Sequence, residues 1–344
     1  MNNHEKIWLS ILKKGEMTPN ELNILDSKLV CPITDFAILQ VTGNDRYEFL
    51  QNQLTSDLNK AEVEVKPEFS SWCNLKGRVI ANFLILTTTE SYLLILKKDM
   101  TDYVLKKLKM YILRSDVKIN DITEEMLLIG FANYNTHQSP LVSLGPGPGR
   151  EDWSMFDLSN SGGKYGNRPG YLIKLPDFSN RFLAITHVTE TENLLHHIYE
   201  CRNTIVNFKI WNKLDILAGF AWIDFKNKEK FLPQMLNLDK FGAVSFSKGC
   251  YVGQEVIARL HYRGKVKKSL QLFKTKLNSF EDGYLYQNDA STKIGEILNF
   301  DNISNTTYGL AVIESDKLDK AIYADKIKMN KLEVLPMNMN FGEQ

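Results

Sequence analysis

The apolar and polar positions of the first third of the chain follow two periods. Apolar residues at every second position mark strands, and apolar residues three and four apart mark one face of a helix. Residues 1–25 predict a short helix followed by a turn. The order of the elements after it is typical of an α+β sandwich, in which helices cover one face of an antiparallel sheet. These elements are a strand at Phe36–Val41, a helix from Asn44, strands at Val79–Thr87 and Tyr92–Leu96, a helix around Leu105–Leu113 and a strand at Val117–Ile119.

The middle of the chain continues in the same way. Strands are predicted at Met126–Phe131, Tyr171–Leu175 and Phe182–Thr186, and a helix at Thr191–Cys201. The stretch Ser139–Gly170 is rich in glycine and proline and has no clear period, so we expect a surface loop there.

Short alternating segments replace the helices from about Lys268 onward and predict a separate antiparallel barrel or sandwich. The fold class predicted for the whole chain is therefore α+β with a C-terminal antiparallel β-barrel. The predicted domains are an N-terminal α+β lobe or pair of lobes at 1–120, a second α+β lobe at 121–262 and the barrel at 263–344. The strands expected in the barrel are Leu270–Thr275, Lys293–Phe300, Thr307–Ile313 and Lys326–Val334.

Composition narrows the class of protein. The hydrophobic fraction is 43%, the charged fraction 24% and the net charge +1. These values are typical of a globular chain and argue against a dedicated nucleic-acid coat protein. No apolar run approaches the ~20 residues that a membrane span needs. The cysteines are widely separated and form no Cys-x-x-Cys pair, which favours a reducing, cytoplasmic location. They are Cys31, Cys73, Cys201 and Cys250.

The segment 245–255 carries the clearest candidate chemistry. Apolar residues four apart from Val252 onward predict a helix that begins near Tyr251. Cys250 would then lie at the helix N-terminus beside Lys248, and both the unpaired amides and the ammonium would favour a reactive thiolate. The alternative is a small buried cysteine packed in a tight turn.

A basic strip follows this segment directly. Such a run is most often a solvated face, and the functional alternative is a docking strip for phosphates or for a chain of carboxylates. No spacing of possible ligands fits a metal template, so we predict no metal site. The strip contains Arg259, His261, Arg263, Lys265, Lys267 and Lys268.

Two aromatic residues allow two interpretations. Trp211 lies near the start of a predicted helix, and Phe36 opens a predicted strand. Aromatic residues at such places usually belong to the core. The sharper hypothesis is that the two rings form the walls of a slot for a flat heterocycle.

Residues 248–255 read Lys-Gly-Cys-Tyr-Val-Gly-Gln-Glu. This segment resembles the signature K-G-C-[FY]-x-G-Q-E of the YgfZ family of folate-binding proteins at every fixed position. Further matches lie at 41–45, 49–58, 76–78 and 231–239, so the resemblance covers most of the chain. The matching signature residues are Lys248, Gly249, Cys250, Tyr251, Gly253, Gln254 and Glu255.

The resemblance implies a fold, a cofactor and a role. The family is related to the T-protein of glycine cleavage, an aminomethyltransferase, which implies ferredoxin-like lobes around a central folate channel and a C-terminal β-barrel. It also implies tetrahydrofolate or a folate derivative as cofactor, and iron–sulfur enzymes as clients, including those that thiolate tRNA. Phe36 and Trp211 would flank the folate, and Arg259 and Arg263 would meet its glutamate tail or a partner. Cys250 would be the reactive centre, with Lys248 beside it.

The chain departs from its relatives at several positions, and two other functions stay open. Leu217 stands where relatives commonly have Glu, and leucine cannot hydrogen-bond a pterin. Phe36 stands where bacterial members often have Trp. The T-protein has an acidic residue where this chain has Ala81-Asn82, which argues against aminomethyl transfer. The alternatives are a folate-dependent one-carbon transferase or oxidase acting on an amine, and a tRNA-binding module that uses the strip Arg259–Lys268.

Overall fold

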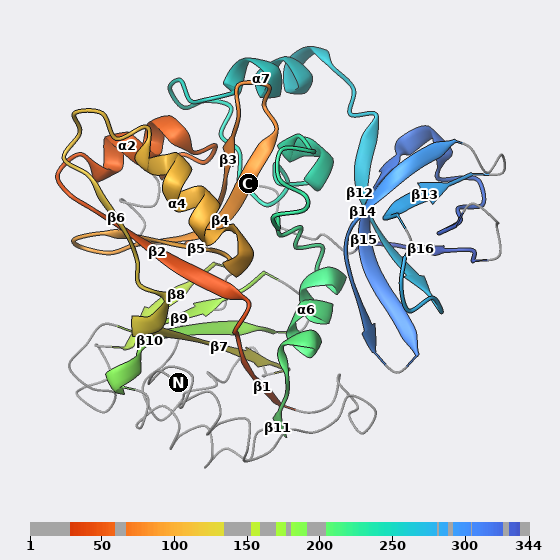
Figure 1. The fold of residues 1–344 in the computed structure, drawn as a ribbon, viewed down its shortest axis with the longest axis horizontal. Helices are drawn as coiled ribbons and strands as arrows, with labels where there is room; N and C mark the ends of the chain where they lie inside the picture. The colour runs from red at the N-terminus through yellow and green to blue at the C-terminus, as the bar shows by residue number, and fades with distance from the viewer. Residues whose placement is uncertain are drawn as a thin grey trace. The chain divides into compact units, whose positions relative to one another are not determined.

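The computed structural model divides the chain into two compact units, each assembled from separated stretches (Figure 1). Unit 1 comprises Met1–Arg46, Leu58–Glu68 and Leu84–Trp211, and unit 2 comprises Tyr47–Asp57, Phe69–Phe83 and Asn212–Gln344. The three contiguous domains expected from the sequence, at 1–120, 121–262 and 263–344, stay a prediction. The structure describes residues 28–58, 67–133, 153–158, 170–176, 180–190, 204–280, 282–287, 292–303, 305–325 and 330–337.

Unit 1 contains a six-stranded sheet with the order β11-β1-β7-β10-β9-β8. Its central strand β7 is buried at all seven positions, which explains why it reads as a continuous apolar run and not as an alternation. Neighbouring strands are antiparallel except for β1 and β11, which are parallel. The strands are β1 (Leu29–Pro32), β7 (Met126–Ala132), β8 (Met155–Asp157), β9 (Tyr171–Lys174), β10 (Phe182–His187) and β11 (Thr204–Ile205).

A five-stranded sheet has the order β3-β4-β5-β2-β6. Its strands are β2 (Phe36–Thr42), β3 (Glu68–Cys73), β4 (Val79–Thr87), β5 (Tyr92–Lys97) and β6 (Lys118–Asp121). The helix α4 (Thr101–Lys109) contacts β2 and β6 and buries Val104 and Leu108. The helix α2 (Arg46–Gln53) follows β2 and buries Phe49, Leu50 and Gln53.

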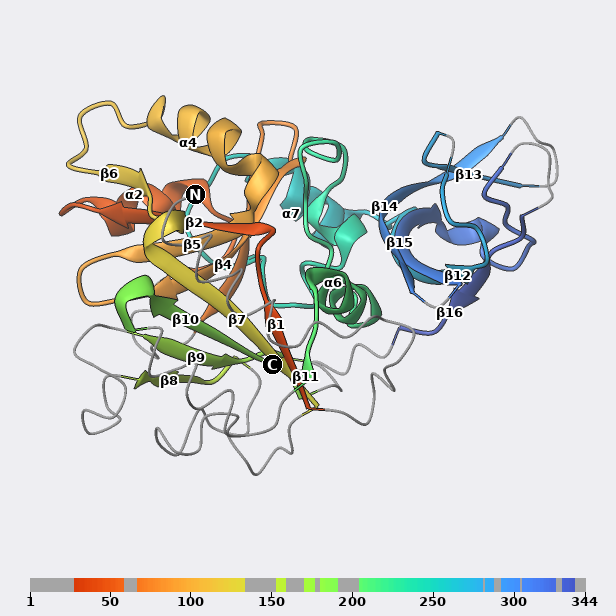
Figure 2. The same cartoon turned by 60° about the horizontal axis from the view of Figure 1, so that its bottom comes forward.

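The C-terminal part of unit 2 forms an antiparallel sheet with the order β13-β14-β15-β12-β16. Its core includes Phe273, Ile294 and Ile313. The pairing shifts between Leu285 and Tyr286, and again between Ile297 and Asn299, and such bulges bend a sheet. Figure 2 shows the curvature that results. The strands are β12 (Lys268–Thr275), β13 (Tyr284–Tyr286), β14 (Lys293–Ile303), β15 (Thr306–Glu314) and β16 (Glu333–Leu335).

The closed barrel expected from the sequence is wrong for the part of the chain that the structure describes. The edge strands β13 and β16 have three residues each, too few to continue the ladder around a barrel. Only isolated bridges connect this side of the sheet, from Tyr286 to Tyr323 and from Tyr323 to Lys331. The mixed α/β class with several sheets is confirmed. Of the strand predicted at 326–334, residues 326–329 lie outside the described residues, and the described part contains β16.

The strands predicted by period are confirmed as β2, β4, β5, β6, β7, β9, β10, β12, β14 and β15. The expected loop Ser139–Gly170 is wrong in one place, because it contains β8, whose three residues are half-buried. The helices expected within 1–25 and at Thr191–Cys201 lie outside the described residues. None of the helices that the structure describes has the length and apolar character needed to cross a bilayer.

Candidate functional site

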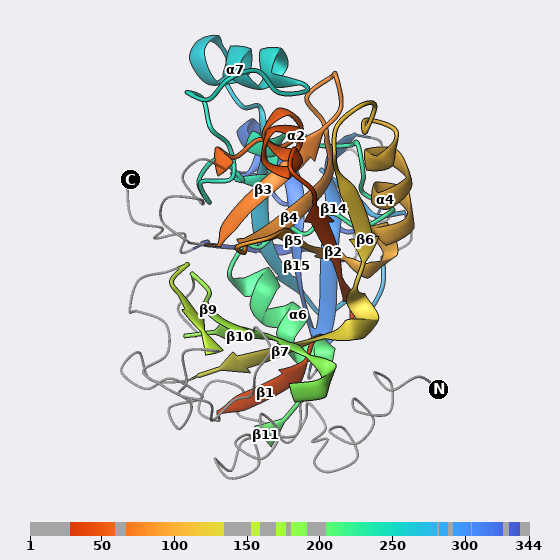
Figure 3. The same ribbon diagram turned by 90° about the vertical axis from the view of Figure 1, so that its left-hand side faces the viewer.

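The signature segment forms a loop that leads into the helix α7 (Gln254–Arg263) of unit 2. Gly253 is the N-cap of this helix and has a φ of +83°, a left-handed conformation that favours glycine. A Cβ at this position would lie 2.4 Å from the carbonyl oxygen of Asn74 and 3.0 Å from the Cα of Gly77. The second glycine of the signature is therefore required by the close approach of the loop to the β3–β4 turn, which lies beside α7 (Figure 1, Figure 3).

The β3–β4 turn that receives Gly253 is stiffened by one asparagine. The side-chain oxygen of Asn74 accepts hydrogen bonds from the backbone amides of Lys76 and Arg78, at 2.9 and 3.1 Å. Its amide group donates to Glu229 at 3.1 Å. Gly77, with a φ of +70°, packs against Val256 and Ile257 of α7. The helix start is thus fixed by the turn and not by a side-chain cap.

Lys248 is the main anchor of the loop. Its side chain is only 9% exposed, and its ammonium donates to the backbone oxygens of Gln51, Leu54 and Ser56 at 2.7, 3.0 and 2.6 Å. The side-chain oxygen of Gln51 lies at 3.2 Å. Gln51 lies in the last turn of α2 (Arg46–Gln53), where the helix dipole favours a cation, and Leu54 and Ser56 follow the helix directly. Four acceptors surround three protons, so the buried charge is fully satisfied.

A second set of hydrogen bonds holds the start of the loop. The amide of Ser245 donates to the backbone oxygen of Thr55 at 2.8 Å. The hydroxyl of Thr55 donates to the backbone oxygen of Ala243 at 2.6 Å and lies 2.8 Å from the hydroxyl of Ser71. Thr55 and Ser71 are fully buried. The loop is therefore attached to the same 51–56 segment at two points.

Cys250 follows the Lys248 anchor by two residues and is exposed. The helix expected to begin near Tyr251 begins at Gln254, so Cys250 precedes the N-cap by three residues. The Lys248 ammonium is directed at the end of α2. The loop therefore presents Cys250 to solvent from a fixed backbone. The neighbouring Gly249 also lies in open space, because a Cβ added there would meet no atom within 4 Å.

The other described cysteines are buried. Cys73, on β3, has its pKa raised to about 12 by burial, with a hydrogen bond from Ser71 as a smaller opposing effect. The thiol of Cys31 lies 3.4 Å from the backbone oxygen of Asn207. Among the three cysteines that the structure describes, Cys250 alone is open to solvent.

The remaining signature residues support the loop or face solvent. Tyr251 is 7% exposed, and burial raises the pKa of its hydroxyl. The side-chain amide of Gln254 donates to the backbone oxygen of Lys248 at 3.5 Å, and Glu255 is exposed. Arg259 and Arg263, on the same helix, are exposed.

Phe36 and Trp211 belong to unit 1 and are packed within it. Trp211 is on α6 (Phe208–Leu217) and is 4% exposed. A Cβ on Gly130 of β7 would lie 2.3 Å from its ring, so this glycine makes the space that the indole fills. The Arg181 guanidinium lies 4.7 Å from the centroid of the indole, in cation–π geometry. Phe36 meets the ring of Phe208 edge-on at 6.0 Å.

Asn82 is a structural residue that the sequence did not indicate. Its amide group donates to the backbone oxygen of Ala221 at 2.7 Å, and its side-chain oxygen accepts from the amide of Ile223 at 2.9 Å. Both contacts are buried. The sequence feature that could have revealed this role is the position of Asn82 as a polar residue inside the apolar run of β4. Ala81 beside it is 1% exposed.

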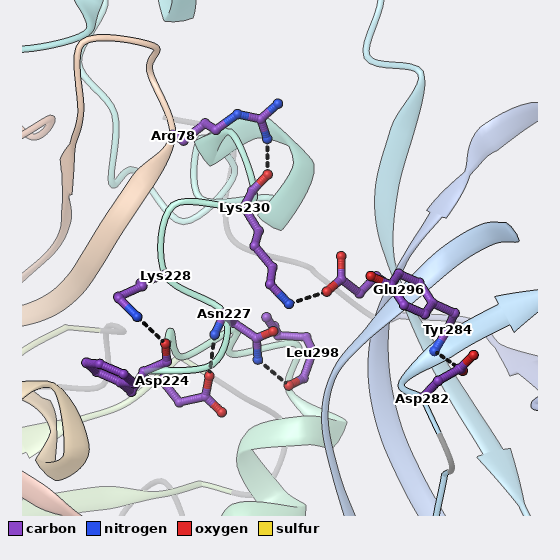
Figure 4. Close-up of polar contacts among 10 residues, drawn as sticks. Arg78, Asp224, Asn227, Lys228, Lys230, Asp282, Tyr284, Glu296 and Leu298 are labelled. Atoms are coloured by element: carbon purple, nitrogen blue, oxygen red, sulfur yellow. Dashed lines mark hydrogen bonds and ion pairs between the residues drawn. The ribbon is translucent and has the colours of Figure 1, made fainter.

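The segment 224–230 connects the β3–β4 turn to the C-terminal sheet within unit 2 (Figure 4). Arg78 donates to the backbone oxygen of Lys230, whose ammonium pairs with Glu296 of β14. The side-chain amide of Asn227 donates to the backbone oxygen of Leu298 at 2.7 Å. Within the described ranges, no group of three or more His, Cys, Asp or Glu side chains is arranged to hold a metal ion.

Comparison with known proteins decides the family. No protein-family profile matches the chain. A curated relative from Hamiltonella defensa, the tRNA-modifying protein YgfZ, is 30% identical over 245 residues, which cover 69% of this chain and 67% of the relative. The chain belongs to the YgfZ family. The family expected from the signature at 248–255 is thereby confirmed.

The fold of this YgfZ family member has a counterpart among solved structures. The glycine cleavage system aminomethyltransferase T from Bartonella henselae superposes with a TM-score of 0.73 over 96% of this chain and 89% of that one. The two sequences are 13% identical, so the similarity concerns the fold. The aminomethyltransferase-like fold expected from the sequence is confirmed.

The anchoring role of Lys248 can be tested by Lys248→Met, which keeps the length of the side chain and removes the charge. The backbone oxygens of Gln51, Leu54 and Ser56 would stay buried without their donor. We expect the free energy of unfolding in urea to fall by about 3 kcal/mol. Lys320→Met, at an exposed lysine, is the control and should change it by less than about 0.5 kcal/mol. Equal effects of the two variants would contradict the anchoring role.

Proposed function

We propose that this protein is a folate-binding factor that supports the assembly or repair of iron–sulfur enzymes, including those that thiolate tRNA. Membership of the YgfZ family supports the proposal, and so does the name of the curated relative, which is called a tRNA-modifying protein. The single observation that carries it is the exposed Cys250 on a loop anchored by Lys248. A soft sulfur at a fixed, accessible position suits contact with a client or with a sulfur-bound iron centre.

The candidate folate contacts fit the cofactor in their chemistry. An indole can stack on a pterin and a guanidinium is a planar donor, but Trp211 is 4% exposed and Arg181 is fully buried, so a pterin would meet these groups only where this packing opens. Arg259 and Arg263 are exposed cations suited to the carboxylates of a glutamate tail. Phe36 would support the folate site through its ring contact with Phe208, which lies on the same helix as Trp211. When bound, the folate would supply a carrier for one-carbon units.

Asn82 argues against the transferase alternative. Proton transfer to or from a folate nitrogen needs an ionisable group, and this position has an amide with both ends bound to backbone. A carboxylate there could not donate to the backbone oxygen of Ala221. The residue therefore serves the packing of β4, and we propose a maintenance factor and not an aminomethyltransferase.

The role of Cys250 is tested by Cys250→Ser in cells that lack their own copy of the protein. Serine keeps the size of the side chain and loses the soft sulfur. We expect the activity of a cellular iron–sulfur enzyme to fall to the level of the empty vector, with an unchanged melting temperature. Ser247→Ala, at an exposed neighbour in the loop, should restore activity fully. Full activity with Cys250→Ser would overturn the role of this thiol.

The folate contact is tested by calorimetric titration with tetrahydrofolate. Trp211→Phe keeps an aromatic face and should retain most of the affinity, whereas Trp211→Ala should weaken binding about tenfold because a stacked ring is lost. Trp222→Phe, at the indole that donates to Asp215, is the control. Equal affinity of the wild type and Trp211→Ala would leave Trp211 with a packing role alone.

A further inference from the structure

An aromatic stack joins the signature loop to the end of α7. The rings of Phe246 and His261 are parallel within 14°, with centroids 3.7 Å apart. Tyr262 meets His261 edge-on at 4.8 Å and Phe246 at 6.4 Å. Tyr262 is 67% exposed and His261 is exposed as well. The open part of this stack is therefore an aromatic surface that a flat ligand could reach.

The residues around this stack are cationic. Between Arg259 and Lys267 the sequence contains no aspartate or glutamate. Arg263, Lys265 and Lys267 are exposed, whereas Val266 between the two lysines is half-buried. Both lysines of this segment therefore lie at the surface.

The structure shortens the strip expected from the sequence by one residue. Lys268 belongs to β12 and pairs with Glu314 of β15 at 3.2 Å, so its charge is part of the C-terminal sheet. The cations beside the aromatic stack are therefore those of α7 and of the segment that follows it. We name the surface formed by His261, Tyr262, Arg263, Lys265 and Lys267 the α7 surface.

Aromatic faces interleaved with outward cations match one class of ligand. Nucleotide bases stack on exposed rings, and phosphates pair with lysine and arginine, so the combination is typical of proteins that bind single strands. A chain of carboxylates would use the cations and leave the rings without a role. We propose that the α7 surface binds a single-stranded nucleic acid, with bases on Tyr262 and His261 and phosphates on Arg263, Lys265 and Lys267. This proposal goes beyond folate binding, shares only Arg263 with the proposed contact to the glutamate tail, and does not depend on that contact.

The test measures the affinity of the full chain for a labelled 12-nucleotide uridine RNA by fluorescence anisotropy, between 50 and 200 mM salt. Three phosphate contacts predict a slope of log K against log salt of about −2. Lys265→Gln/Lys267→Gln should make the slope shallower by about 1.4, because each contact to a single strand contributes about 0.7. Tyr262→Ala should lower the affinity about tenfold and leave the slope unchanged.

Matched control variants come from unit 1, which has exposed cations and an exposed tyrosine of its own. Lys106→Gln/Lys109→Gln and Tyr111→Ala should leave the affinity and its salt dependence unchanged. The substituted side chains are exposed, and unchanged melting temperatures would verify the fold. Because neither Lys265 nor Lys267 is a proposed folate contact, tetrahydrofolate affinity should also stay the same in the double variant.

Three results would overturn the proposal. The first is the absence of measurable binding at 50 mM salt. The second is an equal loss of affinity in the unit 1 controls, which would indicate attraction to cations in general. The third is full displacement of the RNA by a polyglutamate peptide together with no effect of Tyr262→Ala, which would assign the surface to an acidic chain.

Discussion

A buried ammonium determines how the signature loop is held. Lys248 is 9% exposed, and a charge in that position is costly unless every proton finds an acceptor. The last turn of α2 and the segment that follows it provide those acceptors, the backbone oxygens of Gln51, Leu54 and Ser56. The interaction connects positions almost two hundred residues apart in the sequence. It fixes the backbone on which Cys250 is presented to solvent.

Other polar side chains of unit 2 also hydrogen-bond to the backbone of stretches that are distant in the sequence. Asn82 ties β4 to the backbone at 221 and 223, and Asn227 ties the 224–230 segment to β14. Thr55 connects the 51–56 segment to the start of the loop. Each of these contacts satisfies a buried backbone group that no strand or helix could pair. The candidate site is therefore a product of tertiary hydrogen bonding more than of local helix or strand geometry.

The sequence predicted the elements that have a clear period and missed those that depend on tertiary contacts. The strands β2, β4 and β5 carry continuous or alternating apolar residues, and their predicted bounds agree with the observed ones to within one residue. The predicted start of α7 near Tyr251 was wrong, because Gly253 has a left-handed backbone as the N-cap and the helix begins only at Gln254. The short strands β8, β13 and β16 have too few residues for a period. For the site, the signature identified Cys250 and Lys248, but the acceptors of Lys248 lie too far away in the sequence to be inferred.

The signature loop and α7 bring together an exposed thiol, a buried anchor and an aromatic, basic surface. The exposure of Cys250 is measured by the rate at which N-ethylmaleimide modifies each cysteine of the native protein at pH 7.5, followed by peptide mass. We expect Cys250 to react at the rate of a free solvent-exposed thiol. Cys73, whose pKa burial raises to about 12, should stay unmodified until the protein unfolds. Protection of Cys250 to the same degree as Cys73 would contradict the account.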